Sequence, residues 1–347
     1  MKKIKIAIIG VLGYAGEELL KIIFRHPHVE LVYLGDKLQK TKKLKEIFPY
    51  ITGDKGEIEC INVSIKENIA SSSLKNADVV FLALPHGISM DMVSELMNAG
   101  RRVIDLSADY RIKNPKIYEK WYSYKHSHPE LLKKAVYGLP EFYREQIKTA
   151  TLIANPGCYP TSIILGCAPL FAKKITIEDL IVDSKSGISG GGRAFVKEYL
   201  SQGMDDTCPY QIGGIHRHIP EIEQELFSNS TQKSLKIVFT PNIVPQERGM
   251  ISSIYIKSKQ KMKLSQLIEF YANFYRTEPF VRVLKDKIPH TSNVINTNYC
   301  EIGMTVDMRT NTLIIFSAID NLIKGASGQA VQNLNIMFNL DEKTALT

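Results

Sequence analysis

The sequence predicts an α/β fold made of two domains, one built on a parallel sheet and a second, α+β domain with a mixed or antiparallel sheet. Strand and helix signals alternate through the first half of the chain, and strands dominate the second half. The chain has 347 residues, which exceeds what one hydrophobic core usually organises. Hydrophobic residues make up 44% and charged residues 23%, as is typical of folded globular proteins.

The first half of the chain reads as repeated strand–helix–strand units. Continuous apolar runs indicate buried strands, whereas apolar residues three or four positions apart indicate helices. These patterns predict strands at Ile4–Ile9, Val29–Leu34, Asp78–Leu84 and Arg102–Leu106, with helices at Glu17–Phe24 and Met90–Met97. Because such units place neighbouring strands parallel, we expect a parallel sheet with helices on its faces.

The character of the chain changes after Leu152–Asn155, and the second half contains fewer helix signals. Its expected strands are Ile177–Ser184, Leu235–Thr240, Ile251–Lys257, Tyr299–Asp307 and Leu313–Ala318. Alternation mixed with apolar pairs is typical of a sheet covered on one face, so a mixed or antiparallel sheet is predicted. A last helix is expected at Asp320–Leu340, and its periodicity does not say which domain it packs on.

Net charge and cysteine spacing exclude several classes of function. A formal charge of +8 and a pI of about 9.0 suit either nucleic acids or anionic small molecules. The densest basic cluster, Lys37–Lys45, lacks the interleaved aromatic residues of a base-stacking surface, so no nucleic-acid partner is expected. The five cysteines show no paired metal-ligand spacing, so neither a metal site nor a disulfide framework is predicted.

The amino-terminal segment does not have the pattern of a targeting or membrane segment. Lys5 and Gly10 interrupt the apolar run at Ile4–Leu12, and no small-residue cleavage site follows it. Nowhere does the chain contain the about 18 uncharged apolar residues that a membrane span requires. We therefore expect no membrane partner and a cytoplasmic location.

The glycine-rich segment between the first strand and the first helix is one candidate binding site. Gly10, Gly13 and Gly16 allow a backbone to approach a pyrophosphate at a helix N-terminus, although turn glycines without a ligand are the simpler alternative. Asp36 ends the second strand, where an acidic residue binds a ribose 2′-hydroxyl and favours NAD. The lysines after it can instead neutralise a 2′-phosphate, namely Lys37, Lys40, Lys42 and Lys43. These residues alone leave NAD and NADP open.

The candidate nucleophile is Cys158, within the segment Asn155–Thr161. Pro160 suits a first helical turn, and an apolar helix is expected over Ser162–Phe171. Cys158 is therefore expected at the amino end of a helix, where unpaired N–H groups and the helix dipole favour a thiolate. A buried cysteine at a domain junction is the alternative, and it accounts better for Cys167.

A base for this thiol and a site for anions are expected elsewhere in the chain. His216 and His218 flank Arg217, and at strand spacing the two imidazoles share a face, although spacing does not choose between them. The segment Lys185–Arg193 follows a strand and combines glycine amides, hydroxyls and an arginine. Such a loop can bind phosphate or an oxyanion, and a flexible connection is the alternative.

These segments occur together in a known family. The sequence resembles the N-acetyl-γ-glutamyl-phosphate reductases of arginine biosynthesis, within the aspartate-semialdehyde dehydrogenase-like reductases. The motifs follow the family's order and span nearly the whole chain. They are Gly10–Gly16 (GVLGYAG), Leu84–Gly87 (LPHG), Asp105–Arg111 (DLSADYR), Tyr137–Glu141 (YGLPE), Asn155–Thr161 (NPGCYPT), Lys185–Arg193 (KSGISGGGR), His216–Ile222 (HRHIPEI), Arg248–Met250 (RGM) and Asp320–Asn333 (DNLIKGASGQAVQN).

The resemblance implies a Rossmann-like NADP-binding domain at residues 1–157 and 321–347, and a catalytic and oligomerisation domain at residues 158–320. It implies NADPH rather than NAD, and a homodimer or homotetramer. Family members usually have a Ser-Arg pair after the second strand, where this chain has Asp36-Lys37, and this departure weakens the NADP assignment. The implied cofactor-binding residues are Gly10, Gly13, Tyr14, Ala15, Gly16, Lys37, Pro85, Ser186, Gly187 and Asn321.

The resemblance also implies a reaction. It is the NADPH-dependent reduction of N-acetyl-glutamyl 5-phosphate, an acyl phosphate, to N-acetyl-glutamate 5-semialdehyde through a thioester on Cys158, with His218 or else His216 as acid/base. Two alternatives are a carrier-bound aminoadipyl-phosphate reductase of lysine biosynthesis and a nucleotide-sensing homologue without catalysis. The implied substrate-binding residues are Arg111, Asn155, Ser189, Arg193, Arg217 and Arg248.

Overall fold

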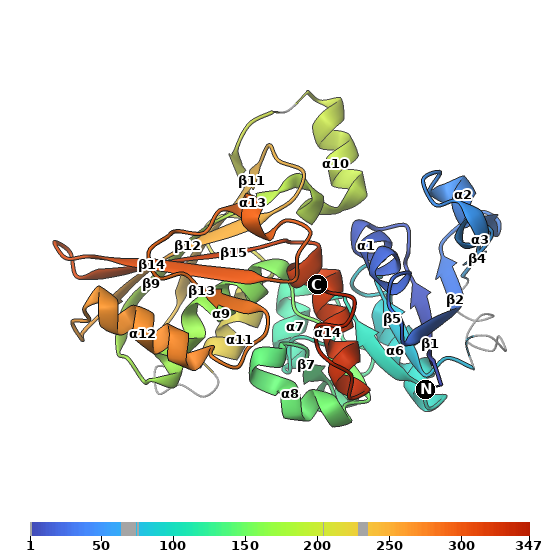
Figure 1. The fold of residues 1–347 in the computed structure, drawn as a ribbon, viewed down its shortest axis with the longest axis horizontal. Helices are drawn as coiled ribbons and strands as arrows, with labels where there is room; N and C mark the ends of the chain where they lie inside the picture. Colours follow the sequence, from blue (N-terminus) through green and yellow to red (C-terminus); the bar gives the residue numbers. More distant parts are fainter. Residues whose placement is uncertain (1, 64–73, 75, 204, 228–234) are drawn as a thin grey trace.

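The computed structural model describes residues 2–347 except 64–73, 75, 204 and 228–234. Within these residues the strands form two large sheets, the first in the N-terminal half of the chain and the second in the C-terminal half (Figure 1). The predicted order, a parallel sheet followed by a mixed one, is confirmed. None of the described helices combines the length and apolar character that a membrane crossing requires.

The described strands of the first sheet have the order β3-β4-β2-β1-β5-β6-β8-β7. Neighbours are parallel except β3 and β4. The chain moves from β1 outward to β2 and then returns to β5 on the other side of β1, so the strand order reverses between β1 and β5. Ligands of such sheets bind beyond the carboxyl ends of the strands at this reversal. The strands are β1 (Ile4–Ile9), β2 (Val29–Asp36), β3 (Lys42–Lys43), β4 (Glu59–Asn62), β5 (Val79–Leu82), β6 (Arg102–Asp105), β7 (Val136–Tyr137) and β8 (Leu152–Ala154).

Helices pack on the first sheet from both ends of the chain. Helix α1 (Tyr14–Ile23) buries Leu19 and Leu20 in the same apolar core as Val331 and Leu334 of the last helix, α14 (Gly328–Met337). Helix α14 thus packs on the first sheet, which its periodicity left open, and it lies where the two halves of the molecule meet (Figure 1). The remaining helices of this half are α2 (Leu44–Ile47), α3 (Gly53–Gly56), α6 (Ser89–Asn98), α7 (Pro115–Tyr122), the 3₁₀ helix η1 (Pro129–Lys133) and α8 (Pro140–Thr149).

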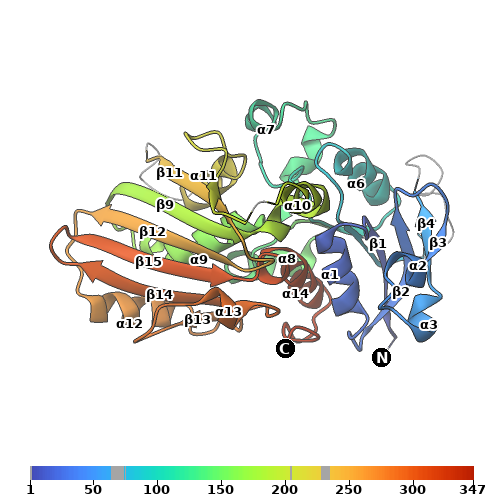
Figure 2. The same cartoon turned by 90° about the horizontal axis from the view of Figure 1, so that it is seen from above.

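The second sheet is mixed, and its described strands have the order β10-β11-β9-β12-β15-β14-β13. Strand β9 pairs parallel with β11 and antiparallel with β12. Helices α9, α11 and α12 lie on one face of this sheet (Figures 1 and 2). The strands are β9 (Ile177–Gly187), β10 (Cys208–Pro209), β11 (Ile237–Val244), β12 (Met250–Ser258), β13 (Val281–Val283), β14 (Cys300–Asp307) and β15 (Thr312–Ile319). The helices are α9 (Cys158–Ala172), the 3₁₀ helix η2 (Ile188–Gly191), α10 (Gly192–Ser201), α11 (Ile219–Phe227), α12 (Leu264–Phe274) and α13 (Thr291–Val294).

Several expected elements differ from the structure at their ends; the strand expected at Leu235–Thr240, for example, is observed at Ile237–Val244. Helix α1 begins at Tyr14 rather than Glu17, because the last residues of the glycine-rich segment form its first turn. Strand β9 continues to Gly187 because Ser186 pairs with neighbouring strands on both sides, so the expected loop begins later. The uniform helix expected over Asp320–Leu340 was wrong: a π-helix, η3 (Ile323–Ser327), precedes α14. The proposed domain boundaries stay a prediction.

Candidate active site

The loops that follow β1, β5, β6 and β8 gather at the carboxyl edge of the first sheet. A methyl group added at Gly10 would lie 2.3 Å from the carbonyl oxygen of Ala83, so the glycine-rich loop packs directly on the chain that leaves β5. Next to this contact lies a cavity of about 570 Å³. Seven of the predicted site residues line it: Pro85, Arg111, Cys158, Ser186, His216, Arg217 and His218.

Cys158 is the first residue of helix α9, as predicted, and no side chain of the described residues caps this helix. The thiolate expected there is not favoured, however. Burial raises the pKa of the Cys158 thiol to about 11, although hydrogen bonding from the Tyr159 backbone and the positive charge of Arg111 act in the opposite direction. Burial therefore outweighs the helix terminus, and the thiol needs a base before it can attack a carbonyl carbon.

His216 and His218 lie in the turn that precedes α11, not in a strand, yet their rings are adjacent with centroids 4.9 Å apart. Burial, followed by the charges of Arg111 and Arg217, lowers the pKa of His218 to about 3. Burial lowers the pKa of His216 to about 2. Both imidazoles are therefore neutral near pH 7, and a neutral imidazole can accept a proton.

The two histidines differ in their contacts. The backbone N–H of His218 donates to Nδ1 of His216 at 3.1 Å, which occupies the lone pair of that ring. A methyl group at Gly157 would lie 2.8 Å from Nε2 of His218 and 2.9 Å from Nη1 of Arg111. The His218 imidazole thus borders the residue directly before Cys158.

The low pKa values of these histidines predict an acid-sensitive fold. An unfolded histidine has a pKa near 6.5, above the folded values of about 3 for His218 and about 2 for His216. Below pH 6.5 the unfolded chain binds more protons, so the free energy of unfolding decreases as the pH falls toward 3. We expect His218→Gln to flatten this slope in urea unfolding between about pH 7 and pH 4. An unchanged slope would show that His218 is not buried as a neutral ring.

Arg111 connects two of the loops at the sheet edge. Its Nη2 and Nε donate to the backbone carbonyls of Leu106 and Asn155, each at 2.7 Å. Its Nη1 lies 3.4 Å from Oε2 of Glu221, whose other oxygen accepts the Gly157 N–H at 3.0 Å. The sequence analysis did not identify Glu221 as a site residue. Its place in the HRHIPEI motif, three residues after His218, was the available signal.

Arg217 is the predicted arginine that faces the cavity without an acidic partner among the described residues. Its Nη1 lies 3.0 Å from Nε2 of His86, and its guanidinium lies 5.5 Å from the centroid of the Tyr122 ring. A guanidinium in this position suits a carboxylate or a phosphate. His86, which lies in the LPHG motif but is not among the predicted site residues, contacts this guanidinium and orients it.

The other two predicted anion-binding arginines lie outside the cavity. Arg193 donates to the carbonyl of Leu12, forms an ion pair with Glu17 and lies 4.4 Å from the centroid of the Tyr14 ring. Arg248 pairs with Asp320 through Nη2 and Oδ1 at 3.2 Å, and with Glu18. Both arginines thus connect the second half of the chain to helix α1. Their substrate-binding roles stay predictions.

Several predicted polar residues hold neighbouring segments together. Asn321 accepts the Gly249 N–H at 2.8 Å and donates to Oγ of Ser189 at 2.9 Å. Asn155 donates to the carbonyl of Ala326 and accepts from Asn333. The N–H groups of Gly187, Ile188 and Ser189 donate to backbone carbonyls at Gly249, Gln246 and Glu247. The segment Lys185–Arg193 therefore offers the cavity fewer free backbone N–H donors than its sequence indicated.

The glycine-rich segment at the start of α1 fits a dinucleotide. Gly10 has φ +96°, and a methyl group on Gly16 would lie 2.1 Å from the Gly10 carbonyl oxygen, so both positions require glycine. At Gly13, by contrast, the nearest atom would be 3.9 Å away, which leaves room for a ligand. No described side chain caps α1, so its first N–H groups are free to bind a pyrophosphate.

The end of β2 has both residue types that can contact the ribose of the cofactor: an acid for a 2′-hydroxyl and lysines for a 2′-phosphate. Asp36 Oδ2 accepts the Leu12 N–H at 2.6 Å, which connects the acid to the glycine-rich loop. Lys37 is exposed beside it, whereas Lys43 pairs with Glu57. Of the lysines that the sequence offered for a 2′-phosphate, Lys37 is therefore the one placed next to Asp36.

Comparison with known proteins covers nearly the whole chain. Residues 5–150 match the family described as "Semialdehyde dehydrogenase, NAD binding domain", and residues 158–321 match "Semialdehyde dehydrogenase, dimerisation domain". The N-acetyl-gamma-glutamyl-phosphate reductase of Geotalea daltonii is 47% identical over 99% of this chain and 98% of its own length. That of Desulforudis audaxviator is 44% identical with the same coverage.

Solved structures share the fold. Aspartate semialdehyde dehydrogenase II from Vibrio cholerae superposes with a TM-score of 0.73 at 16% identity, covering 98% of this chain and 99% of its own. The enzyme from Candida albicans, solved with NADP, has a TM-score of 0.66 at 17% identity, covering 97% and 99%. The NAD-binding domain and the glycine cradle together indicate a nicotinamide cofactor. The chain belongs to the N-acetyl-γ-glutamyl-phosphate reductases, oxidoreductases of the semialdehyde dehydrogenase type.

Proposed function

We propose that this chain reduces N-acetyl-γ-glutamyl phosphate to N-acetyl-glutamate 5-semialdehyde and phosphate, with NADPH as the reductant. The observation that carries the proposal is one cavity wall that combines a thiol, a neutral imidazole and an arginine without an acidic partner among the described residues: Cys158, His218 and Arg217. The relatives that carry this name share 44–47% of their residues with the chain.

The first half of the reaction forms a thioester. His218 accepts the proton of the Cys158 thiol, and the sulfur attacks the acyl carbon of the substrate. The C–O bond to phosphate then breaks, phosphate leaves and takes up a proton from solvent, and the acyl group remains on sulfur. Arg217 neutralises one anionic group of the substrate, and the N–H groups at the start of α9 stabilise charge on the carbonyl oxygen.

The second half releases the aldehyde. Gly10–Gly16 would hold a nicotinamide nucleotide, which would supply the hydride that converts the thioester to a thiohemiacetal. His218, protonated in the first half, gives its proton to the oxygen of that adduct. It takes the proton back as the C–S bond breaks and the aldehyde forms, and it returns the proton to the Cys158 sulfur.

The substrate is tested in the reverse direction. N-acetyl-glutamate 5-semialdehyde and phosphate should reduce NADP⁺ with the wild-type protein, whereas omission of phosphate should stop the reaction. If this aldehyde gives no NADP⁺ reduction but a carrier-bound aminoadipate semialdehyde does, the carrier-bound compound would replace the proposed substrate. Silence with both aldehydes, together with tight nucleotide binding, would favour the sensor alternative.

The preference for NADP is proposed to depend on Lys37. We expect Lys37→Met to reduce kcat/KM for NADPH about tenfold while kcat/KM for NADH changes little, because a charge-assisted contact to the 2′-phosphate is lost. Asp36→Asn should act in the opposite direction, since it removes a carboxylate that repels the phosphate. The exposed Lys148→Met is the matched control. Equal losses with both nucleotides would assign the 2′-phosphate to another cation.

A homo-oligomer is proposed to form through the uncovered face of the second sheet. Ile181, Val238 and Tyr255 are exposed there, and strand register places them side by side, Val238 against Ile181 and Ile181 against Tyr255. An apolar row of this kind indicates an interface. Light scattering of Ile181→Lys should show a smaller particle than the wild type.

A further inference from the structure

The π-helix η3 touches the nucleophile. A methyl group added at Gly325 would lie 2.7 Å from Cβ of Cys158 and 3.2 Å from its Cα. The Gly325 backbone therefore forms the surface against which the first residue of α9 rests. π-Helices are rare, and they occur frequently at functional sites. None of the steps proposed above assigns a role to this element.

The next two residues of η3 contact the rest of the site. The carbonyl of Ala326 accepts from Nδ2 of Asn155, at the start of the loop that leads to Cys158, at 3.0 Å. Oγ of Ser327 donates to the carbonyl of Ala15, in the first turn of α1, at 2.6 Å. A shift of η3 would therefore move the nucleophile loop and the glycine-rich loop together.

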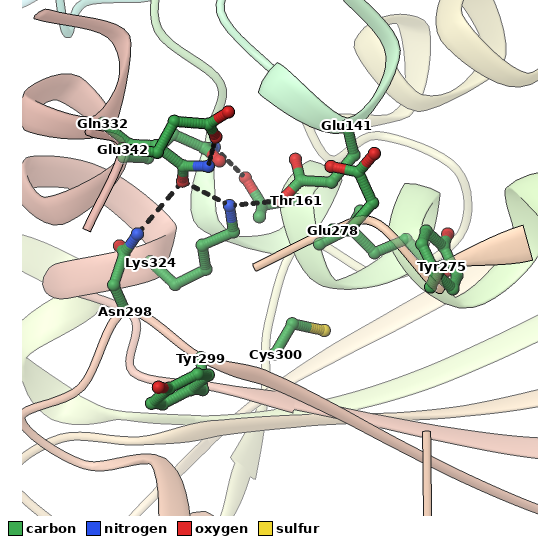
Figure 3. Close-up of polar contacts among 12 residues, drawn as sticks. Glu141, Thr161, Tyr275, Glu278, Asn298, Tyr299, Cys300, Lys324, Gln332 and Glu342 are labelled. Atoms are coloured by element: carbon green, nitrogen blue, oxygen red, sulfur yellow. Dashed lines mark hydrogen bonds and ion pairs between the residues drawn. The ribbon is translucent and has the colours of Figure 1, made fainter. Parts of the chain in front are cut away.

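Lys324, the residue before Gly325, extends into a polar cluster (Figure 3). Its Nζ donates to Oε1 of Glu141 at 2.7 Å and to Oε1 of Gln332 at 3.0 Å. Gln332 also accepts from Asn298 and donates to Glu342, each at 3.0 Å (Figure 3). Both members of the ion pair, Lys324 and Glu141, are fully buried.

A fully buried ion pair contributes little to the net stability of a fold. The free energy needed to remove both charges from water cancels much of their electrostatic attraction. Apolar residues of similar size therefore often stabilise a fold equally well. Such a pair does, however, restrict the backbone that carries it, because only one placement satisfies both charges. Here Glu141 lies in the first turn of α8 and Lys324 lies in η3, so the pair fixes η3 to the helices that cover the first sheet.

We propose that Lys324 is a positioning residue for the reaction. Its ion pair with Glu141 holds η3 in place, so that Gly325 keeps Cys158 in a fixed position relative to the glycine-rich segment Gly10–Gly16. The inference rests on the proposed function. It gives a common reason for the YGLPE and DNLIKGASGQAVQN motifs, since each supplies one member of the pair. Lys324 is not among the described residues that line the cavity, so it acts through Gly325.

The test compares single and double charge removal. Lys324→Met and Glu141→Gln should each lower the unfolding temperature, because one buried charge is left unpaired. The double variant K324M/E141Q should recover most of that loss, yet its kcat should stay about 10²-fold below wild type with KM unchanged, because a small displacement of reacting groups is enough for such a loss. Its rate of Cys158 alkylation by iodoacetamide should also differ from wild type.

The matched control is Arg144→Met, which removes ion pairs with Glu278 and Glu342 from the same helix α8. It should lower stability without the loss in kcat. Recovery of both stability and kcat in the double variant, or an equal kcat loss in Arg144→Met, would overturn the proposal and leave the pair a structural one.

A second variant keeps the test decisive if the charge variants fail to fold. Gly325→Ala leaves the ion pair intact and adds a methyl group against Cys158. A folded Gly325→Ala protein with normal kcat and normal alkylation would overturn the proposal. If the wild type shows no reductase turnover, the proposed function fails, whereas the alkylation rates still decide whether the ion pair positions the thiol.

Discussion

Replacing Cys158 with serine is expected to reduce kcat/KM by about 10⁴- to 10⁶-fold, the range typical of lost nucleophiles. Burial already raises the pKa of the Cys158 thiol to about 11, and a serine hydroxyl in the same place is far less acidic. The serine hydroxyl is therefore harder for the neutral His218 to deprotonate than the thiol is. The measurement is the phosphate-dependent reduction of NADP⁺ by the semialdehyde. Cys208→Ser, at an exposed thiol, is the matched control and should stay active.

The covalent intermediate gives an independent check on this result. Wild-type protein mixed with acyl phosphate in the absence of nucleotide should gain the mass of the acyl group on the peptide that contains Cys158, and Cys158→Ser should not. Residual turnover near the wild-type level in a correctly folded serine variant would remove Cys158 from the mechanism, whatever the labelling shows.

Replacing His218 with glutamine is expected to reduce kcat about 10²- to 10⁴-fold, the contribution of a positioned acid/base. Glutamine can occupy a similar volume but cannot transfer a proton. Because the pKa of the Cys158 thiol is raised to about 11, the variant should regain activity as the pH rises toward that value and hydroxide supplies the thiolate. The wild type, whose His218 is neutral well above its pKa of about 3, should change less over the same range.

His216→Asn provides the comparison within the pair. Its side-chain oxygen can still accept the His218 N–H that Nδ1 of His216 accepts at 3.1 Å. We therefore expect a smaller loss than in His218→Gln and no recovery at high pH. A larger loss for His216→Asn would exchange the two assignments.

The strands β1, β5 and β6 of the first sheet could be predicted because each is a short apolar run that is largely buried, whereas the short strands β3, β4 and β7 were not predicted. Ile4–Ile9 is predicted without error because its apolar residues end at Gly10, where the chain must turn. The end of β9 could not be predicted in this way. Its polar residues Lys185 and Ser186 are held in the strand by two neighbours that are distant in sequence, β11 and β12.

The same distinction applies to the candidate site: features that depend on local sequence could be predicted, and features that depend on tertiary packing could not. Cys158 and the two histidines are recognisable from local motifs, and the structure places all three on one cavity. The pairing of Arg111 with Glu221 joins residues 110 positions apart, so no local pattern reveals it. The protonation state of the thiol likewise depends on how deeply packing buries it, which the position at a helix terminus does not determine.

The packing of α14 has a consequence for biosynthesis. Val331 and Leu334 complete the same core as Ile6 and Ile8, so the first sheet gains its last covering layer only when the end of the chain has left the ribosome. During translation the first sheet is therefore expected to expose apolar surface while the residues of the second sheet are synthesised. A nascent chain stalled before Gly328 should bind chaperones, whereas a chain that has emerged beyond Met337 should not.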